Sequence, residues 1–130
     1  MSLLADLTAQ VLAFRDERDW AQFHTLRNLI VSLNLEAGEL LELTQWKNDT
    51  EMEMEMAALA SNAEAHAALC DECADVLIYL LLIAERAGID LEAAARAKLA
   101  RNAERYPVET SYGSSRKYSA TADGKCRHGP

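Results

Sequence analysis

One stretch of the sequence, residues 63–87, indicates the class of fold; it reads AEAHAALCDECADVLIYLLLIAERA. Its apolar residues recur with the 3.6-residue period of a helix, and Gly88 follows where a C-terminal glycine commonly ends one. Between Val76 and Ala84 the predicted helix is apolar on nearly every side, and such a helix is normally buried. Because a small monomeric bundle rarely covers a segment of this kind completely, we expect a homo-oligomer in which helices pack across subunits.

Three further helices are predicted on either side of this stretch by the same period. The first covers residues 3–19, and residues 20–24 form a connector. Thr25 is the predicted N-cap of the second, which covers about residues 26–47. Asp90 is the predicted cap of the fourth, over about residues 91–105, which ends at Tyr106-Pro107. The sequence therefore predicts an all-α, four-helix bundle-like domain.

Two segments lack this period. Residues 48–62 contain the strict alternation Glu51-Met52-Glu53-Met54-Glu55-Met56, which is typical of a strand, but an isolated strand has no partner in an α chain. We expect a long hairpin connection that is flexible or partly helical. From Pro107 onward the chain is rich in Ser, Gly, Thr and Lys. We expect a domain over residues 1–118, extended after Pro107 where it touches the body, and a disordered tail over 119–130.

Length and composition exclude several classes of protein. A chain of 130 residues suits one domain, and five Gly and two Pro are few for a sandwich or barrel. No apolar run is long enough to span a membrane, and we expect no signal peptide, because Asp6 interrupts the first apolar stretch. Three cysteines suggest reduced thiols and a cytoplasmic location. The net charge of −8 argues against nucleic-acid or anionic membrane partners.

Two pairs of acidic residues have the spacing that places both members on one face of a helix. They are Glu36 with Glu39, and Glu72 with Asp75. Both pairs merge into apolar runs, where unpaired carboxylates are costly to bury. Residues 28–85 hold twelve carboxylates and a single cation, Lys47, so metal ions are the expected counter-charge. The alternative is a pair of solvated acidic faces.

The absence of histidine from these two acidic pairs indicates the kind of metal. Di-iron carboxylate bundles use Glu-x-x-His, and none of the histidines here follows a glutamate at that spacing. An all-oxygen set suits Mg²⁺, or Mn²⁺ in its place, both of which take up substrate phosphates. The sequence therefore favours phosphoryl chemistry by a metal-activated water.

The predicted fourth helix carries the complementary charge. Lys98, Asn102 and Arg105 share one face, near Tyr106, and suit phosphate oxygens unless they simply form a solvated face. Trp20, Trp46 and Tyr79 lie near the polar positions of the chain, where a base can stack on an aromatic ring.

A cysteine pair offers a weaker hypothesis of a zinc or redox site. Cys70-x-x-Cys73 lies inside a predicted helix, and its conceivable distal ligands, Cys126 and His128, lie in the predicted tail.

Taken together, these residues resemble a known family, the all-α nucleoside triphosphate pyrophosphatases of the MazG-like group, particularly the dCTP pyrophosphatase branch. The four acids match its two acidic motifs. The flanking matches are Arg18-Asp19-Trp20, Phe23-His24, Arg27-Asn28-Leu29, Gln45-Trp46-Lys47, Asp75-Val76-Leu77-Ile78-Tyr79-Leu80, Lys98, Asn102, Arg105-Tyr106-Pro107-Val108, Gly113-Ser114 and Arg116-Lys117-Tyr118. The stretch between Glu39 and Glu72 is longer than is usual for the family.

The resemblance implies Mg²⁺-dependent hydrolysis of a (deoxy)nucleoside triphosphate to the monophosphate and pyrophosphate, with dCTP or a 5-modified dCTP favoured, in nucleotide-pool house-cleaning. It also implies a homodimer or a homotetramer (a dimer of dimers) with sites at subunit contacts. It assigns metal binding to Glu36, Glu39, Glu72 and Asp75, with Glu36 or Glu39 as the base. It also assigns substrate contacts, to the base and sugar by Trp20, His24 and Trp46, near the nucleotide by Tyr79, and to the phosphates by Lys98, Asn102, Arg105 and Tyr106. The rival hypothesis is a non-catalytic helical interaction module that binds a nucleotide without hydrolysing it.

Overall fold

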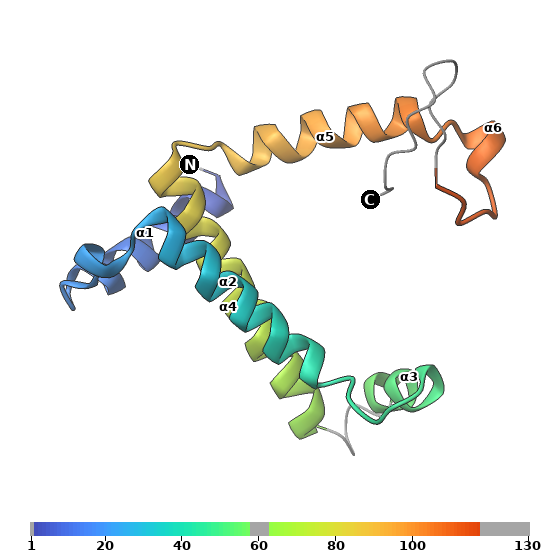
Figure 1. Ribbon diagram of the computed structural model, residues 1–130, viewed down its shortest axis with the longest axis horizontal. Coiled ribbons are helices and arrows are strands. Elements are labelled where there is room, and N and C mark those ends of the chain that lie inside the picture. The colour runs from blue at the N-terminus through green and yellow to red at the C-terminus, as the bar shows by residue number, and fades with distance from the viewer. Residues whose placement is uncertain (1, 58–62, 118–130) are drawn as a thin grey trace. The chain divides into compact units, whose positions relative to one another are not determined.

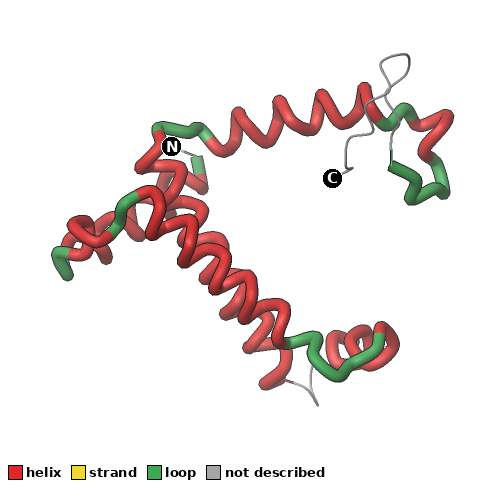
Figure 2. Tube along the Cα trace, in the orientation of Figure 1, coloured by secondary structure: helices red, strands yellow, loops and turns green. Residues whose placement is uncertain are grey.

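The computed structural model describes residues 2–57 and 63–117, and these are helical with no strand (Figure 2). The prediction of an all-α fold is therefore confirmed for the described ranges. The α-helices are α1 Leu3–Asp16, α2 Leu26–Glu42, α3 Asp49–Ala57, α4 Ala63–Ala87, α5 Leu91–Arg105 and α6 Val108–Ser111, with a 3₁₀ helix at Trp20–Phe23. None of the described helices is long and apolar enough to cross a membrane.

The chain divides into two compact units, of which the first is Met1–Ile89. Within it α2 and α4 lie side by side along their lengths, α1 packs against α4, and α3 also contacts α4 (Figure 1). The buried core consists of Leu29 from α2 and Leu81, Leu82 and Ala84 from α4. This pairing of α2 with α4 is what positions the site described below.

Helix α4 has the bounds predicted for it, and Gly88 ends it with a φ of +67°, a conformation that favours glycine. The Ile89 backbone N–H donates to the Ala84 carbonyl at 2.8 Å, which closes the last turn. The helix is not buried on every side within one chain, because Leu77 and Leu80 are each 37% exposed. Oligomerisation, which would cover these side chains, stays a prediction.

Helix α2 begins as predicted and ends earlier. The Thr25 hydroxyl accepts a hydrogen bond from the Asn28 backbone N–H at 3.1 Å, which confirms the N-cap. The predicted end at Lys47 is wrong, since α2 stops at Glu42. Trp46 has a φ of +66°, which a right-handed helix does not allow, and the Thr44 hydroxyl donates to the Leu41 carbonyl at 2.7 Å within the turn.

Helix α1 is also shorter than predicted, ending at Asp16 rather than Asp19. Asp19 has a φ of +53°, which breaks the helix, and the Gln22 side-chain amide donates to the Asp19 carboxylate at 2.8 Å. The predicted connector over residues 20–24 is a 3₁₀ helix, Trp20–Phe23, followed by His24.

The Glu/Met alternation forms a helix, α3. Asn48 and Glu51 cap it reciprocally: the Asn48 side-chain oxygen accepts from the Glu51 N–H at 3.0 Å, and the Glu51 carboxylate accepts from the Asn48 N–H at 2.9 Å. Met52 and Met56 line a small cavity with α4 residues that include Leu69, whereas Met54 is 64% exposed. The partly helical connection is thus confirmed for Asp49–Ala57, and the Glu/Met alternation does not mark a face of this helix, because Met54 lies away from Met52 and Met56.

The second unit, Asp90–Pro130, contains α5 and α6. The Asp90 carboxylate accepts from the Ala93 N–H at 2.9 Å and caps α5 as predicted. The expectation of an extended chain after Pro107 is wrong at Val108–Ser111, where the Ser111 N–H donates to the Pro107 carbonyl at 3.0 Å and closes a helical turn. The predicted boundary at residue 118 and the predicted tail at 119–130 lie outside the described residues.

Candidate metal centre

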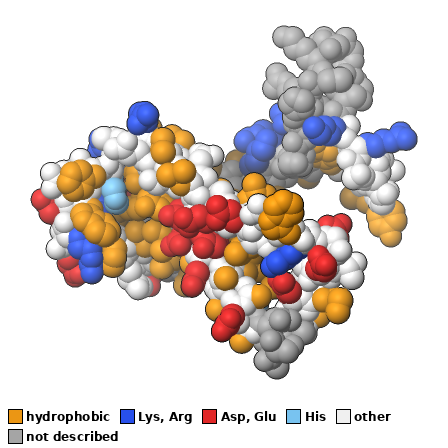
Figure 3. All heavy atoms as spheres, turned by 60° about the horizontal axis from the view of Figure 1, so that its bottom comes forward, with side chains coloured by type: hydrophobic (Ala, Val, Ile, Leu, Met, Phe, Trp, Pro, Cys, Tyr) orange, Lys and Arg blue, Asp and Glu red, His pale blue; other side chains and the backbone are white. Residues whose placement is uncertain are grey.

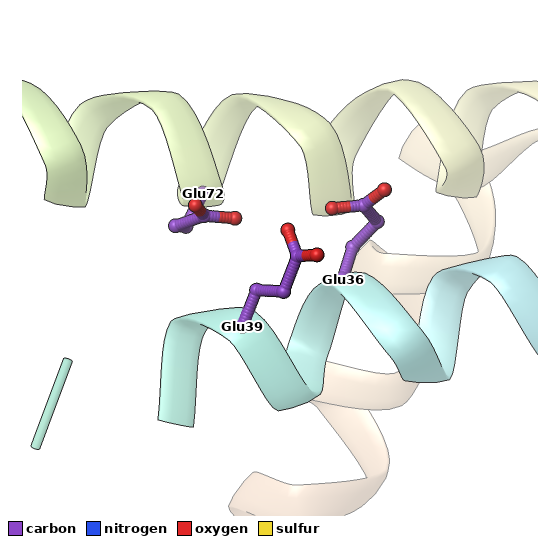
Figure 4. Close-up of side chains that lie close together, drawn as sticks. All are labelled: Glu36, Glu39 and Glu72. Atoms are coloured by element: carbon purple, nitrogen blue, oxygen red, sulfur yellow. The ribbon is translucent and has the colours of Figure 1, made fainter. Parts of the chain in front are cut away.

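Three carboxylates meet where α2 faces α4. Glu36 and Glu39 project from consecutive turns of α2, and Glu72 projects toward them from α4 (Figure 4). One oxygen of each lies within 4.8 Å of one oxygen of the other two. The sequence supplies the spacing that puts Glu36 and Glu39 on one face, and the pairing of the helices brings Glu72 to them.

Two of these carboxylates are partly withdrawn from water. Glu36 and Glu72 are half-buried, and the Oε2 atom of each is buried without a hydrogen-bond partner among the described residues. Glu39 is exposed. Buried carboxylate oxygens normally accept hydrogen bonds or coordinate a cation. The geometry and this lack of partners both indicate a cation-binding group.

The electrostatics of the group agree with this interpretation. Burial raises the pKa of Glu36 above its ordinary value, and the neighbouring carboxylates, Glu39 first among them, raise it further. Burial also raises the pKa of Glu72, and the negative charges of Glu39 and Asp75 raise it further. A raised pKa means that the ionised form of these carboxylates is destabilised in the folded protein. Binding of a proton or of a cation would reduce this destabilisation.

Asp75, the fourth predicted ligand, lies close to the group without being one of its three members. It is half-buried on α4, one turn after Glu72, and its charge contributes to the raised pKa of both Glu36 and Glu72. Lys47, the single cation of the acidic segment, is engaged elsewhere. Its ammonium contacts the Glu55 carboxylate of α3 at 3.0 Å.

The surface around the group is mixed in character. On the face drawn in Figure 3, acidic side chains gather in one patch that hydrophobic side chains border. The donor set of the group is entirely oxygen, which suits hard divalent cations such as Mg²⁺ or Mn²⁺ more than zinc or copper.

The predicted base-binding residues occupy separate places in the first unit. Trp20 is 44% exposed, and its ring meets Phe14 edge-on with 5.8 Å between centroids. Trp46 is 92% exposed in the turn after α2, and Tyr79 is half-buried on α4, four residues after Asp75. No described contact joins either tryptophan to the carboxylates, so their shared role stays a prediction.

His24 has an unusual environment for a surface histidine. Its Nδ1 atom is buried and has no hydrogen-bond partner among the described residues. Burial lowers the pKa of His24, and the positive charge of Arg15 lowers it further. Both effects favour the neutral imidazole, and a ligand would reach the buried Nδ1 only after a local rearrangement.

The predicted phosphate-binding residues belong to the second unit. Lys98 is exposed on α5, while Asn102 and Arg105 are half-buried near its end. The Tyr106 backbone N–H donates to the Asn102 carbonyl at 2.8 Å. The contact of these residues with phosphates stays a prediction.

One contact of the cysteine pair was not predicted from the sequence. Cys70 lies 3.7 Å from the Nδ1 atom of His66, measured from Sγ, whereas the proposed distal residues Cys126 and His128 lie outside the described ranges. The signal was present in the sequence, because His66 and Cys70 are four residues apart on one helix.

Comparisons with known proteins agree on one family. The MazG-like family model matches residues 31–120. The chain is 46% identical over 116 residues to dCTP pyrophosphatase 1 of Mus musculus, covering 89% of this chain and 66% of that protein. It is 42% identical over 121 residues to dCTP pyrophosphatase 1 of Homo sapiens, covering 93% and 69% respectively. The chain thus spans about two thirds of the length of these relatives.

A solved structure is also similar. The crystal structure of a pyrophosphatase from Archaeoglobus fulgidus matches with a TM-score of 0.72 and 36% sequence identity, covering 82% of this chain and 94% of that one. The likeness therefore extends to the arrangement of the helices as well as to the sequence.

Proposed function

Because this chain belongs to the MazG-like family, we propose that it is a metal-dependent nucleoside triphosphate pyrophosphohydrolase. The reaction converts a (deoxy)nucleoside triphosphate to the monophosphate and pyrophosphate, and dCTP or a 5-modified dCTP is the favoured substrate. The names of the mouse and human relatives support the choice of dCTP. Removal of unwanted deoxynucleotides is the role that fits this activity.

One observation carries the proposal: Glu36, Glu39 and Glu72 converge within 4.8 Å, although two of them hold buried oxygens without hydrogen-bond partners. A solvated acidic face, the alternative interpretation of the sequence, would leave such oxygens in water. An all-oxygen group of this kind fits Mg²⁺, with Mn²⁺ as a substitute, and we assign Asp75, whose charge acts on Glu36, as the fourth ligand.

The roles of the residues follow from their chemistry. A divalent ion held by these carboxylates would neutralise the triphosphate and lower the pKa of a bound water. Glu39, the exposed member of the group, is the better placed of the two candidate bases to accept the proton of the attacking water, because Glu36 is half-buried. In-line attack at the α-phosphorus would then release pyrophosphate, whose charge Lys98 and Arg105 would stabilise.

The specificity for the base is assigned to aromatic and imidazole groups. Trp20 and Trp46 offer exposed rings on which a pyrimidine can stack. We assign His24, whose neutral form is favoured by burial, to a contact with the base or sugar.

Pyrophosphate release from a panel of nucleotides tests this proposal. The panel contains dCTP, 5-methyl-dCTP, dUTP, dTTP, dATP, dGTP and the ribonucleotides, each with Mg²⁺ and with Mn²⁺. Preferential hydrolysis of dCTP or its 5-modified form is expected. Equal activity on all nucleotides would retain the reaction and remove the assigned specificity, and tight dCTP binding without any release would favour the non-catalytic binding module.

A further inference from the structure

We propose that α4 carries a second metal site for a thiophilic ion such as Zn²⁺, formed by His66 and Cys70 with Cys73 as a third ligand. These residues lie at positions i, i+4 and i+7 of one continuous helix and so follow one face of it. All three side chains are exposed, which leaves them accessible to an ion from solution. This inference does not depend on the proposed pyrophosphohydrolase activity.

The distance between the first two ligands fits a metal. The Cys70 Sγ atom lies 3.7 Å from Nδ1 and 4.0 Å from Nε2 of His66. In tetrahedral zinc sites the bonds are about 2.3 Å to sulfur and about 2.0 Å to nitrogen, so the two donor atoms are about 3.5 Å apart. A small adjustment of the side chains would therefore let one ion bind both atoms without any change in the backbone.

Cys73 extends the pair by one turn. It follows Cys70 at i+3 on the same exposed face, but the three donor atoms do not all lie within 4.8 Å of one another, so its thiolate would join His66 and Cys70 after a change of side-chain rotamer. Water can take the remaining position, as it does in zinc sites that keep an open coordination position. Binding would release the thiol protons to solvent, since the thiolate is the ligand.

The proposed thiophilic site is distinct from the carboxylate group. Glu72 lies between the two cysteines in sequence, but residues one or two apart on a helix do not face each other. Its half-buried side chain points to α2, whereas the cysteines are exposed. The ligand types differ as well, because thiolate and imidazole select zinc-like ions and carboxylates select Mg²⁺.

Cobalt titration of the full chain tests the proposal, with a phosphine reductant and excess Mg²⁺ to occupy the carboxylates. We expect the near-ultraviolet charge-transfer absorption of a cobalt–thiolate bond, lost again when Zn²⁺ displaces cobalt. Cys70→Ser should abolish this absorption. His66→Ala should weaken cobalt binding at least about tenfold, because even outer-shell partners of metal ligands are worth about 10- to 100-fold in affinity.

The matched control is Cys126→Ser, which removes the third cysteine of the chain and should leave the titration unchanged. Zn²⁺ should also raise the melting temperature of the wild type and not that of Cys70→Ser. Because His66 and Cys70 are exposed, both variants should fold, which circular dichroism checks. Absence of the absorption, its survival in Cys70→Ser, or its loss in Cys126→Ser would each overturn the proposal.

Discussion

The fold brings the carboxylates of Glu36 and Glu72 close together. Lys47, the single cation among residues 28–85, does not balance their charge, because it contacts Glu55. Glu36 and Glu72 each keep a buried oxygen without a partner in the described part of the chain. Carboxylates arranged in this way lower the free energy of unfolding of the ion-free protein, and they can bind a cation. Sites that lower the stability of the folded protein in this way are commonly functional.

Replacement of Glu72 should separate catalysis from folding. We expect Glu72→Gln to reduce Mg²⁺-dependent pyrophosphate release by about 100-fold or more, because a metal contributes several kcal/mol to stabilising the transition state. The control is Asp71→Asn, which neutralises the adjacent exposed carboxylate outside the group and should stay within about twofold of the wild type. Undiminished turnover in folded Glu72→Gln would remove Glu72 from the metal site.

The raised pKa values of Glu36 and Glu72 predict how stability depends on pH. A carboxyl whose pKa is higher in the folded state binds more protons there, so the ion-free protein loses stability as the pH rises from the ordinary glutamate range through the raised pKa. The double variant Glu36→Gln/Glu72→Gln should therefore melt above the wild type at neutral pH, and this difference should vanish on acidification.

Thermal melting with a chelator present, from about pH 8 down to about pH 4, just below the ordinary glutamate pKa, measures this difference. Saturating Mg²⁺ provides the control, since it should stabilise the wild type at neutral pH and have little effect on the double variant. A difference in melting temperature that does not change with pH would show that repulsion between these carboxylates does not limit stability.

At the scale of the element, α3 shows how a local pattern acquires its meaning from packing. A strand would place Met52, Met54 and Met56 on one face, whereas the helix separates Met54 from the other two. Met52 and Met56 line the cavity beside α4, and the Lys47–Glu55 ion pair fastens the helix to the turn before it. The Asn48-x-x-Glu51 capping box is the sequence signal that indicates a helix here.

Two methionine substitutions distinguish the helix from a strand. Met52→Gln should lower the free energy of unfolding by about 1 kcal/mol, because it places a polar group against α4. Met54→Gln, at a side chain that is 64% exposed, should change it by less than about 0.5 kcal/mol. Denaturant unfolding measures both, and equal losses would contradict the assignment of one packed side to α3.

At the scale of the whole molecule, the first unit buries little of its apolar sequence. Among the described residues its buried core consists of Leu29, Leu81, Leu82 and Ala84, while Leu77 and Leu80 of α4 and Leu35 of α2 stay partly or largely exposed. Exposed apolar surface of this extent is typical of proteins that associate. The expected partner is a second copy of the chain.

Light scattering coupled to gel filtration tests this expectation. The wild type should have the mass of a homodimer or homotetramer, and Leu77→Glu should shift it toward the monomer, because a charge buried in an apolar interface is costly. Leu3→Glu, at a side chain that is 84% exposed near the start of α1, serves as the control and should leave the mass unchanged. A monomeric wild type at micromolar concentration would contradict the oligomer.

The sequence alone was enough to establish the all-α class, the bounds of α4, the caps at Thr25 and Asp90, and the placement of Glu36 and Glu39 on one face. These features depend on hydrogen bonds and side-chain periodicity within a few residues, which short stretches of sequence specify. The early ends of α1 and α2, the helical nature of α3, and the meeting of Glu72 with the α2 glutamates required the folded structure. The meeting of the carboxylates and the packing of Met52 and Met56 beside α4 depend on contacts between residues far apart in the chain. The ends of α1 and α2 follow instead from left-handed backbone at Asp19 and Trp46, which the helical period does not reveal.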